Sequence, residues 1–132
     1  MNDATHAAYG AYLRSLADAM LLRDWHVVLS RTPADDDSRA QVSRHAGKNQ
    51  VEISLGKEWL VLSPEQRRQT ATHELLHAHT ARLCRTMRRY ADQAEGDVVR
   101  YVKTAFDDEE EILIDTLARV IAPALPLPPE LP

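Results

Sequence analysis

Five consecutive residues have the types and spacing of a metal site: His73, Glu74, Leu75, Leu76 and His77, an H-E-x-x-H element. Side chains four positions apart lie on the same face of an α-helix, about one turn from each other. If this segment is helical, both imidazoles can bind a single metal ion. Glu74 lies about 100° around the helix from His73, where its carboxylate can hold a water molecule that the metal polarises. The element therefore indicates metal-assisted hydrolysis, with Glu74 as the base.

The motif is short, so its interpretation depends on a third protein ligand, because a catalytic zinc usually keeps three and leaves one position open. Two carboxylates four positions apart occur downstream, at Glu111 and Asp115. The apolar residues around them predict a largely buried helix; they are Ile112, Leu113, Ile114, Leu117, Val120 and Ile121. A buried carboxylate without a partner is costly. We therefore expect Glu111 to bind the metal and Asp115 to accept the free N–H of a ligand histidine.

Other interpretations of these residues remain open. Glu110 or Asp108 could be the third ligand, because helix boundaries estimated from a sequence shift by a few residues. The acidic run could instead only stabilise the N-terminal dipole of its helix. The two histidines could be surface or core side chains at an accidental spacing. Glu111 is preferred because it has a carboxylate four positions on among apolar residues.

Ligands on two segments require helices that pack together, and the sequence predicts both. The segment Ser63-Pro64-Glu65-Gln66 offers a capping Ser, a Pro at the first helical position and a Gln that completes a capping box. From there a helix can continue to Arg89 without a breaker, with the motif in its middle. Residues 90–96 predict a break and 98–106 a short helix. The helix that carries Glu111 is expected at 107–122.

The preceding residues predict a small α+β scaffold. Apolar residues three and four positions apart over 7–23 predict an N-terminal amphipathic helix. Strand patterns cover 25–30, 39–45 and Gln50–Leu55, and we expect them to form a three-stranded antiparallel sheet. Residues 1–122 are thus expected to form one domain. The proline-rich residues 123–132 are expected to be an extended tail.

H-E-x-x-H at 73–77 followed by E-x-x-x-D at 111–115 resembles the gluzincin branch of zinc metallopeptidases. With the helix and sheet before it, the pattern is similar to compact members, such as the peptidase domains of phage and bacterial regulatory proteins. The resemblance implies a zincin-like fold and a zinc ion bound by His73, His77 and Glu111, with Asp115 orienting a histidine. The extended metzincin pattern, with a Gly and a third His at set positions, is absent.

The activity that this resemblance implies is that of a zinc metalloendopeptidase. Zinc would polarise the scissile carbonyl and its bound water, while Glu74 would transfer the proton to the leaving amine. A peptide or protein substrate would lie antiparallel along a sheet edge, for which the strand Gln50–Leu55 is the candidate. Tyr101 is the first candidate, and Tyr90 the second, for the side chain that stabilises the oxyanion.

Two other functions are compatible with the same residues. The chain could be a non-hydrolytic module in which zinc holds the helices together and the sheet edge binds a partner. It could also be a protease that cleaves one specific protein and ignores generic substrates. The presence of Glu74 favours an enzyme, because a structural zinc site needs no base at that position.

Composition limits the remaining classes. The 132 residues are enough for one domain, and 44% hydrophobic with 27% charged residues is typical of a globular protein. A net charge of −4 argues against a nucleic-acid binder; the arginines between 82 and 89 are expected to form a solvated face, with contact to an acidic partner as the alternative. The single cysteine, Cys84, excludes an intramolecular disulfide and a multi-cysteine zinc site. Because we find neither a signal peptide nor a membrane-spanning run, we expect a cytoplasmic protein without membrane contact.

Overall fold

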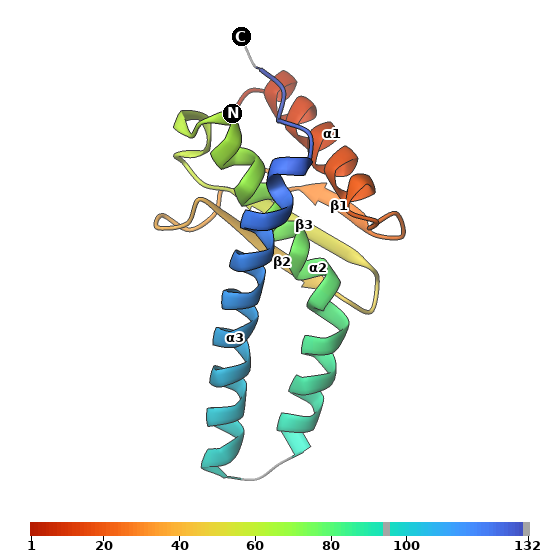
Figure 1. The fold of residues 1–132 in the computed structure, drawn as a ribbon, viewed down its shortest axis with the longest axis vertical. Coiled ribbons are helices and arrows are strands. Elements are labelled where there is room, and N and C mark those ends of the chain that lie inside the picture. The colour runs from red at the N-terminus through yellow and green to blue at the C-terminus, as the bar shows by residue number, and fades with distance from the viewer. Residues whose placement is uncertain (94–95, 131–132) are drawn as a thin grey trace.

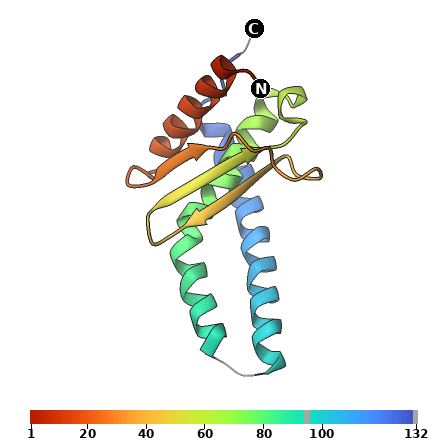
Figure 2. The ribbon, with the colours of Figure 1, turned by 180° about the vertical axis from the view of Figure 1, so that it is seen from behind.

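The computed structural model describes residues 1–93 and 96–130, and its architecture is α+β (Figure 1). Within these ranges the elements follow the order α1 (Asp3–Ala19), β1 (His26–Leu29), β2 (Ala40–His45), β3 (Gln50–Leu55), α2 (Pro64–Gln93) and α3 (Asp97–Ile121). Helices α2 and α3 run side by side behind the sheet and extend past it as a two-helix hairpin (Figure 2). No helix of the described ranges is long and apolar enough to cross a membrane.

The sheet is mixed, with the strand order β1-β3-β2, which corrects the antiparallel sheet expected from the sequence. Strand β3 pairs in parallel with β1 and antiparallel with β2. Val51, Ile53 and Leu55 make β3 an apolar strand with a fully buried inner face, which suits a central position. The connection over 30–39 is longer than a hairpin loop, so the chain crosses from β1 to the far edge before β2 begins.

This strand order moves the free edge of the sheet. Both edges of β3 are paired, so Gln50–Leu55 cannot accept a substrate strand, and that expectation was wrong. Strand β2 is an edge strand instead, and it lies over α2 (Figure 2). Gly56 permits this arrangement, because a Cβ there would lie 2.0 Å from the backbone oxygen of Ser38. Its amide donates to the carbonyl of Arg39 at 2.8 Å and so fixes the start of β2 against the end of β3.

Helix α1 begins and ends four residues earlier than the predicted range of 7–23. It begins at Asp3 because Asn2 is an N-cap, whose side-chain oxygen accepts a hydrogen bond from the amide of Thr5 at 2.8 Å. It ends at Ala19 because the chain turns at Leu21, which has a φ of 61° in the left-handed region. The helix packs its apolar face on β1 and on the core.

Helix α2 begins with the predicted capping box, in which Ser63 and Gln66 exchange two backbone-to-side-chain hydrogen bonds. It continues to Gln93, past the predicted end at Arg89. Residues 90–93 of the predicted break at 90–96 therefore belong to α2. Of the remaining three residues, 94 and 95 lie outside the described ranges. The two helices predicted at 98–106 and 107–122 are the single helix α3, because no glycine or proline interrupts them.

The core lies between α1, the inner face of the sheet and the first half of α2. Its largest fully buried side chains are Trp59, Tyr9, Leu13, Leu16, Ile53, Leu75 and Ile114. The first residues of the proline-rich tail are held against this body. The hydroxyl of Tyr12 donates to the carbonyl of Pro126 at 3.1 Å, and the Arg68 guanidinium donates to the carbonyl of Leu125 at 3.0 Å.

Candidate metal centre

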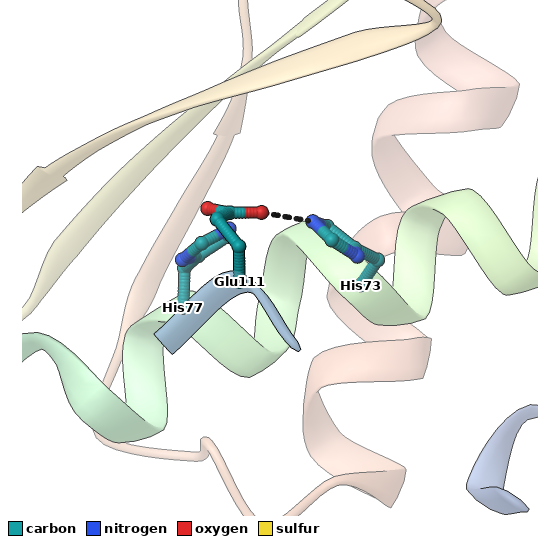
Figure 3. A group of neighbouring side chains, drawn as sticks. All are labelled: His73, His77 and Glu111. Atoms are coloured by element: carbon teal, nitrogen blue, oxygen red, sulfur yellow. Dashed lines mark ion pairs between the residues drawn. The ribbon is translucent and has the colours of Figure 1, made fainter. Parts of the chain in front are cut away.

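His73 and His77 project from α2 toward Glu111 on α3 (Figure 3). The Nε2 atom of His73 lies 3.3 Å from Oε2 of Glu111, and the Nε2 atom of His77 lies 3.2 Å from the other oxygen, Oε1. The candidate ligand atoms of the three residues lie within 4.8 Å of one another. Two ligand atoms of a tetrahedral zinc are about 3.4 Å apart, because each lies about 2.1 Å from the metal. The two nitrogen–oxygen distances therefore match the spacing of zinc ligands.

The other nitrogen of each ring faces a second carboxylate, and both of these carboxylates come from α3. His73 Nδ1 lies 3.1 Å from Asp115 Oδ1, and His77 Nδ1 lies 3.3 Å from Glu110 Oε1. A carboxylate that accepts the Nδ1–H leaves the lone pair on Nε2, which is the nitrogen that faces Glu111. The pairing of Asp115 with a histidine was predicted from the sequence, whereas that of Glu110 was not.

Glu110 is held as an anion inside the protein. Its side chain is 5% exposed and accepts hydrogen bonds from Arg44 Nη1 and from the hydroxyl of Thr80, each at 2.5 Å. Burial alone would raise the pKa of Glu110, but hydrogen bonds from Thr80, Arg44 and Cys84 outweigh it and lower the pKa to about 2. Glu110 is therefore an ionised acceptor for His77 Nδ1. Among the described residues, the group that could hold a metal contains Glu111 and neither of the alternatives Glu110 and Asp108.

Arg44 is a functional residue that the sequence analysis did not identify, although its position in the strand pattern of β2 indicated it. It lies on the same face of β2 as Ala40 and Val42, and these three alternate with exposed residues. A cation on the inward face of a strand needs an anionic partner, and Glu110 is that partner. The network from β2 through Glu110 to His77 therefore ties the edge strand to the candidate ligands.

The expectation of a largely buried α3 was wrong. Its apolar residues outside the α2 contact are exposed, namely Ile112, Leu113, Leu117 and Val120. The side chains of Glu111 and Asp115 are 57% and 53% exposed, so burial is not the reason that they lie beside the histidines. Helix α3 covers α2 with one face only, which leaves the rest of its surface to solvent (Figure 1). The exposure of Glu111 means that the centre is open to solvent on one side.

Glu74 lies next to the candidate ligands and is itself buried, with 7% exposure. Burial and the nearby carboxylate of Glu111 raise the pKa of Glu74 to about 7, against the opposing effect of Arg44. Its side chain lines the same cleft as His73 and His77. A carboxyl with this pKa can both accept and return a proton near neutral pH.

The structure does not bring the predicted tyrosines to the centre. Tyr101 is 75% exposed and lies ten residues before Glu111, or about 15 Å along α3. Tyr90 is 68% exposed and lies thirteen residues after His77, or about 20 Å along α2. Neither lines the cleft at the histidines, where the cationic side chain is Arg44.

Three adjacent hollows follow β2 and share lining residues, and we call them together the β2 groove. The middle hollow, of about 290 Å³, is lined by β2, His73, Glu74, His77 and Glu111. A hollow of about 420 Å³ continues past the start of β2 and shares Ala40 with the middle one. A third, of about 550 Å³, continues past the end of β2 and shares Val42 and Arg44. The candidate ligands therefore lie midway along a groove beside an edge strand.

The charges at the centre favour a cation. Four carboxylates surround the two imidazoles, from Glu74, Glu110, Glu111 and Asp115. Among the described residues, the basic side chains paired with them are Arg44 and Arg119.

No protein-family model, curated protein or solved structure matches this chain. The interpretation of the centre therefore depends on its own geometry and charge.

Replacement of Asp115 by Ala is expected to weaken zinc binding about 10- to 100-fold, because His73 loses the acceptor that orients its ring. Zinc titration in competition with a chromophoric chelator measures this change. Glu109→Ala is the matched control, since it removes an exposed carboxylate from the same helix that is not among the candidate ligands. Equal zinc affinities of the two variants would show that Asp115 does not orient His73.

Proposed function

We propose that the protein is a zinc-dependent peptidase with a zincin-like fold, in which Glu74 is the general base. The observation that carries this proposal is the meeting of His73, His77 and Glu111 beside the buried carboxyl of Glu74. Two imidazole nitrogens and one carboxylate oxygen are a ligand set that zinc binds in hydrolytic enzymes, with one position left open. The solvent exposure of Glu111 is consistent with such an open position.

The metal and Glu74 would have separate roles. Zinc at these three residues would supply Lewis-acid polarisation of the scissile carbonyl and of the attacking water. Glu74 takes the proton from that water and transfers it to the leaving amine, so the same carboxyl acts first as base and then as acid. Its pKa is about 7 in the metal-free protein, because of burial and the nearby Glu111, and a bound cation would lower this value. Glu110 and Asp115 keep the imidazoles in the tautomer that directs Nε2 to the metal.

The β2 groove supports a polypeptide as the substrate. An extended peptide can pair with the free edge of β2 and so cross the ligands at the middle of the groove. Every second side chain of the peptide would then face the groove, and those before and after the metal centre would point into the two outer hollows. This assignment replaces Gln50–Leu55 with Ala40–His45 as the docking strand.

A second function is favoured by a different observation. The candidate ligands come from both α2 and α3, so a metal ion would crosslink the two helices of the hairpin. A zinc-stabilised module that binds a partner without cleaving it would use the same residues. The two functions differ in the need for Glu74, which a structural site does not use.

Mapping of new amino termini by mass spectrometry tests the proposal. The zinc-loaded protein is incubated with a mixture of generic peptides and, separately, with a native cell extract. New termini are expected with the wild-type protein, and are expected to disappear after chelation and with Glu74→Gln. Cleavage of one protein in the extract but of no generic peptide would identify a specific protease. An absence of new termini in both samples, with zinc bound, would refute the peptidase and favour the module.

A further inference from the structure

Four arginines line the third hollow of the β2 groove. It lies between the turn after β2 and the second half of α2, and we call it the arginine pocket. The guanidinium groups that line it belong to Arg44, Arg85, Arg88 and Arg89. Gly47 in the turn makes room for one of them, because a Cβ there would lie only 3.0 Å from Arg85 Nη1. These arginines include part of the run that the sequence predicted to be a solvated face.

The positive charge of this pocket is only partly neutralised. Arg44 is paired with Glu110, and Arg88 lies 3.6 Å from Asp107. The acidic residue in the lining is Asp92, which is itself paired with Lys103 at 2.5 Å. Arg85 and Arg89 form no ion pair with any residue of the described ranges. Two guanidinium groups are therefore available to an anionic ligand.

The pocket lies in line with the candidate metal centre. Arg88 follows His77 by eleven residues, about three turns, and so lies on the same side of α2. Arg85 and Arg89 lie about 80° and 120° around the helix from His77, and both line the pocket. The pocket and the middle hollow share Val42 and Arg44, so they lie next to each other along β2. A ligand that runs along β2 from the metal centre would therefore reach the free arginines.

We propose that the arginine pocket binds an acidic segment of the polypeptide substrate, on the amino-terminal side of the cleaved bond. This inference rests on the proposed peptidase function. A peptide antiparallel to β2 has its amino-terminal part beside the end of β2, where the pocket lies. Arg85 and Arg89 lie about 12 and 18 Å along α2 from His77. At about 3.3 Å per extended residue, the acidic side chains fall about three to five residues before the cleaved bond.

A short acidic peptide fits these observations better than a nucleic acid does. The guanidinium group matches a carboxylate with two parallel hydrogen bonds, and a pocket of about 550 Å³ has room for a few side chains. The protein has a net charge of −4, and the acidic residues 107–111 lie on the neighbouring helix, so a long polyanion would be repelled nearby. An acidic segment of the substrate meets the arginines and needs no extended basic surface.

Peptide binding to zinc-loaded Glu74→Gln tests this proposal without cleavage. The probe is a fluorescein-labelled peptide of about twelve residues with a block of glutamates toward its amino terminus. A peptide with glutamines in that block is the matched probe. The glutamate peptide is expected to bind about tenfold more tightly by fluorescence anisotropy, and the difference is expected to shrink with added salt. The further change Arg85→Gln/Arg89→Gln is expected to remove this preference.

The control is Arg14→Gln/Arg23→Gln in the same background, which removes two exposed charges outside the pocket and is expected to keep the preference. Equal binding of the two peptides, or an equal loss of preference in the control, would overturn the proposal. Tighter binding of a single-stranded DNA oligonucleotide through the same two arginines would overturn the choice of a polypeptide.

Wild-type cleavage of both peptides is a separate measurement. Cleavage of both peptides without a glutamate preference refutes only the pocket. A glutamate preference in binding without cleavage supports the pocket, and the peptidase is then decided by the mapping of new amino termini.

Discussion

Glu74→Gln is expected to reduce cleavage by about 10²- to 10⁴-fold while zinc affinity and thermal stability stay unchanged. Glutamine has nearly the same shape as glutamate, but its amide cannot take a proton from the attacking water. Rates of product formation, zinc titration and thermal unfolding measure the three quantities on one preparation. Glu109→Gln is the matched control, because it removes an exposed carboxylate of α3 outside the groove. A Glu74→Gln variant with the wild-type rate would refute Glu74 as the base.

The pH dependence of cleavage follows from the same carboxyl. Burial and Glu111 raise the pKa of Glu74 to about 7, so its proton-accepting form increases as the pH rises through this value. A bound cation opposes the effect of Glu111, so the midpoint is expected below pH 7. Initial rates of the zinc-loaded wild-type protein between about pH 5 and 8 should therefore rise with pH. A rate that falls over this range would contradict the role of Glu74.

Glu110→Ala is expected to have the largest effect on stability. The substitution leaves the Arg44 guanidinium, which is 17% exposed, without its anion, and His77 without its acceptor. Removal of one partner from a buried ion pair costs about 3–5 kcal/mol of unfolding free energy. Chemical denaturation of the chelated protein measures this cost apart from zinc binding. Asp115→Ala is the comparison, since Asp115 is half exposed and its loss is expected to affect zinc affinity more than stability.

Acid denaturation gives a second measure of Glu110. Its pKa is about 2 in the folded protein and has an ordinary value of 4.5, so its contribution to stability is complete above pH 4.5 and is lost as the pH falls toward 2. The wild-type protein is therefore expected to lose roughly 3 kcal/mol more than Glu110→Gln over this window. Glu109→Gln should behave like the wild type. If Glu110→Gln instead loses as much as the wild type, Glu110 is not held as an anion.

Local rules explain what the sequence alone could predict. The spacing of His73 and His77 needs only helical geometry, and the capping box at Ser63 needs only four residues. The α+β composition of the fold follows from hydrophobic periodicity, which is also a property of neighbouring residues. The strand order does not, because pairing of β1 with β3 joins segments that are separated by β2. The length of the loop over 30–39 was the available signal that β1 and β2 are not neighbours.

The parts of the centre that the sequence did not predict depend on contacts between distant segments. Arg44 meets Glu110 across 66 residues, and nothing near either residue specifies the other. The exposure of α3 likewise depends on which of its faces meets α2. Asp115 was therefore assigned to a histidine by an argument from burial that does not hold, although it does lie beside His73.

Glu110, Glu111 and Asp115 all belong to α3, so, among the described residues, one helix provides every carboxylate that faces a ring nitrogen of the two histidines. A turn of α3 about its axis by a single residue, about 100°, would remove all of these contacts together. The contacts of these three carboxylates with the histidines therefore form or break together. If a metal binds as proposed, its occupancy and the docking of α3 on α2 would form one linked equilibrium, in which each strengthens the other by the same free energy. A ligand that loosens the hairpin would therefore release the metal.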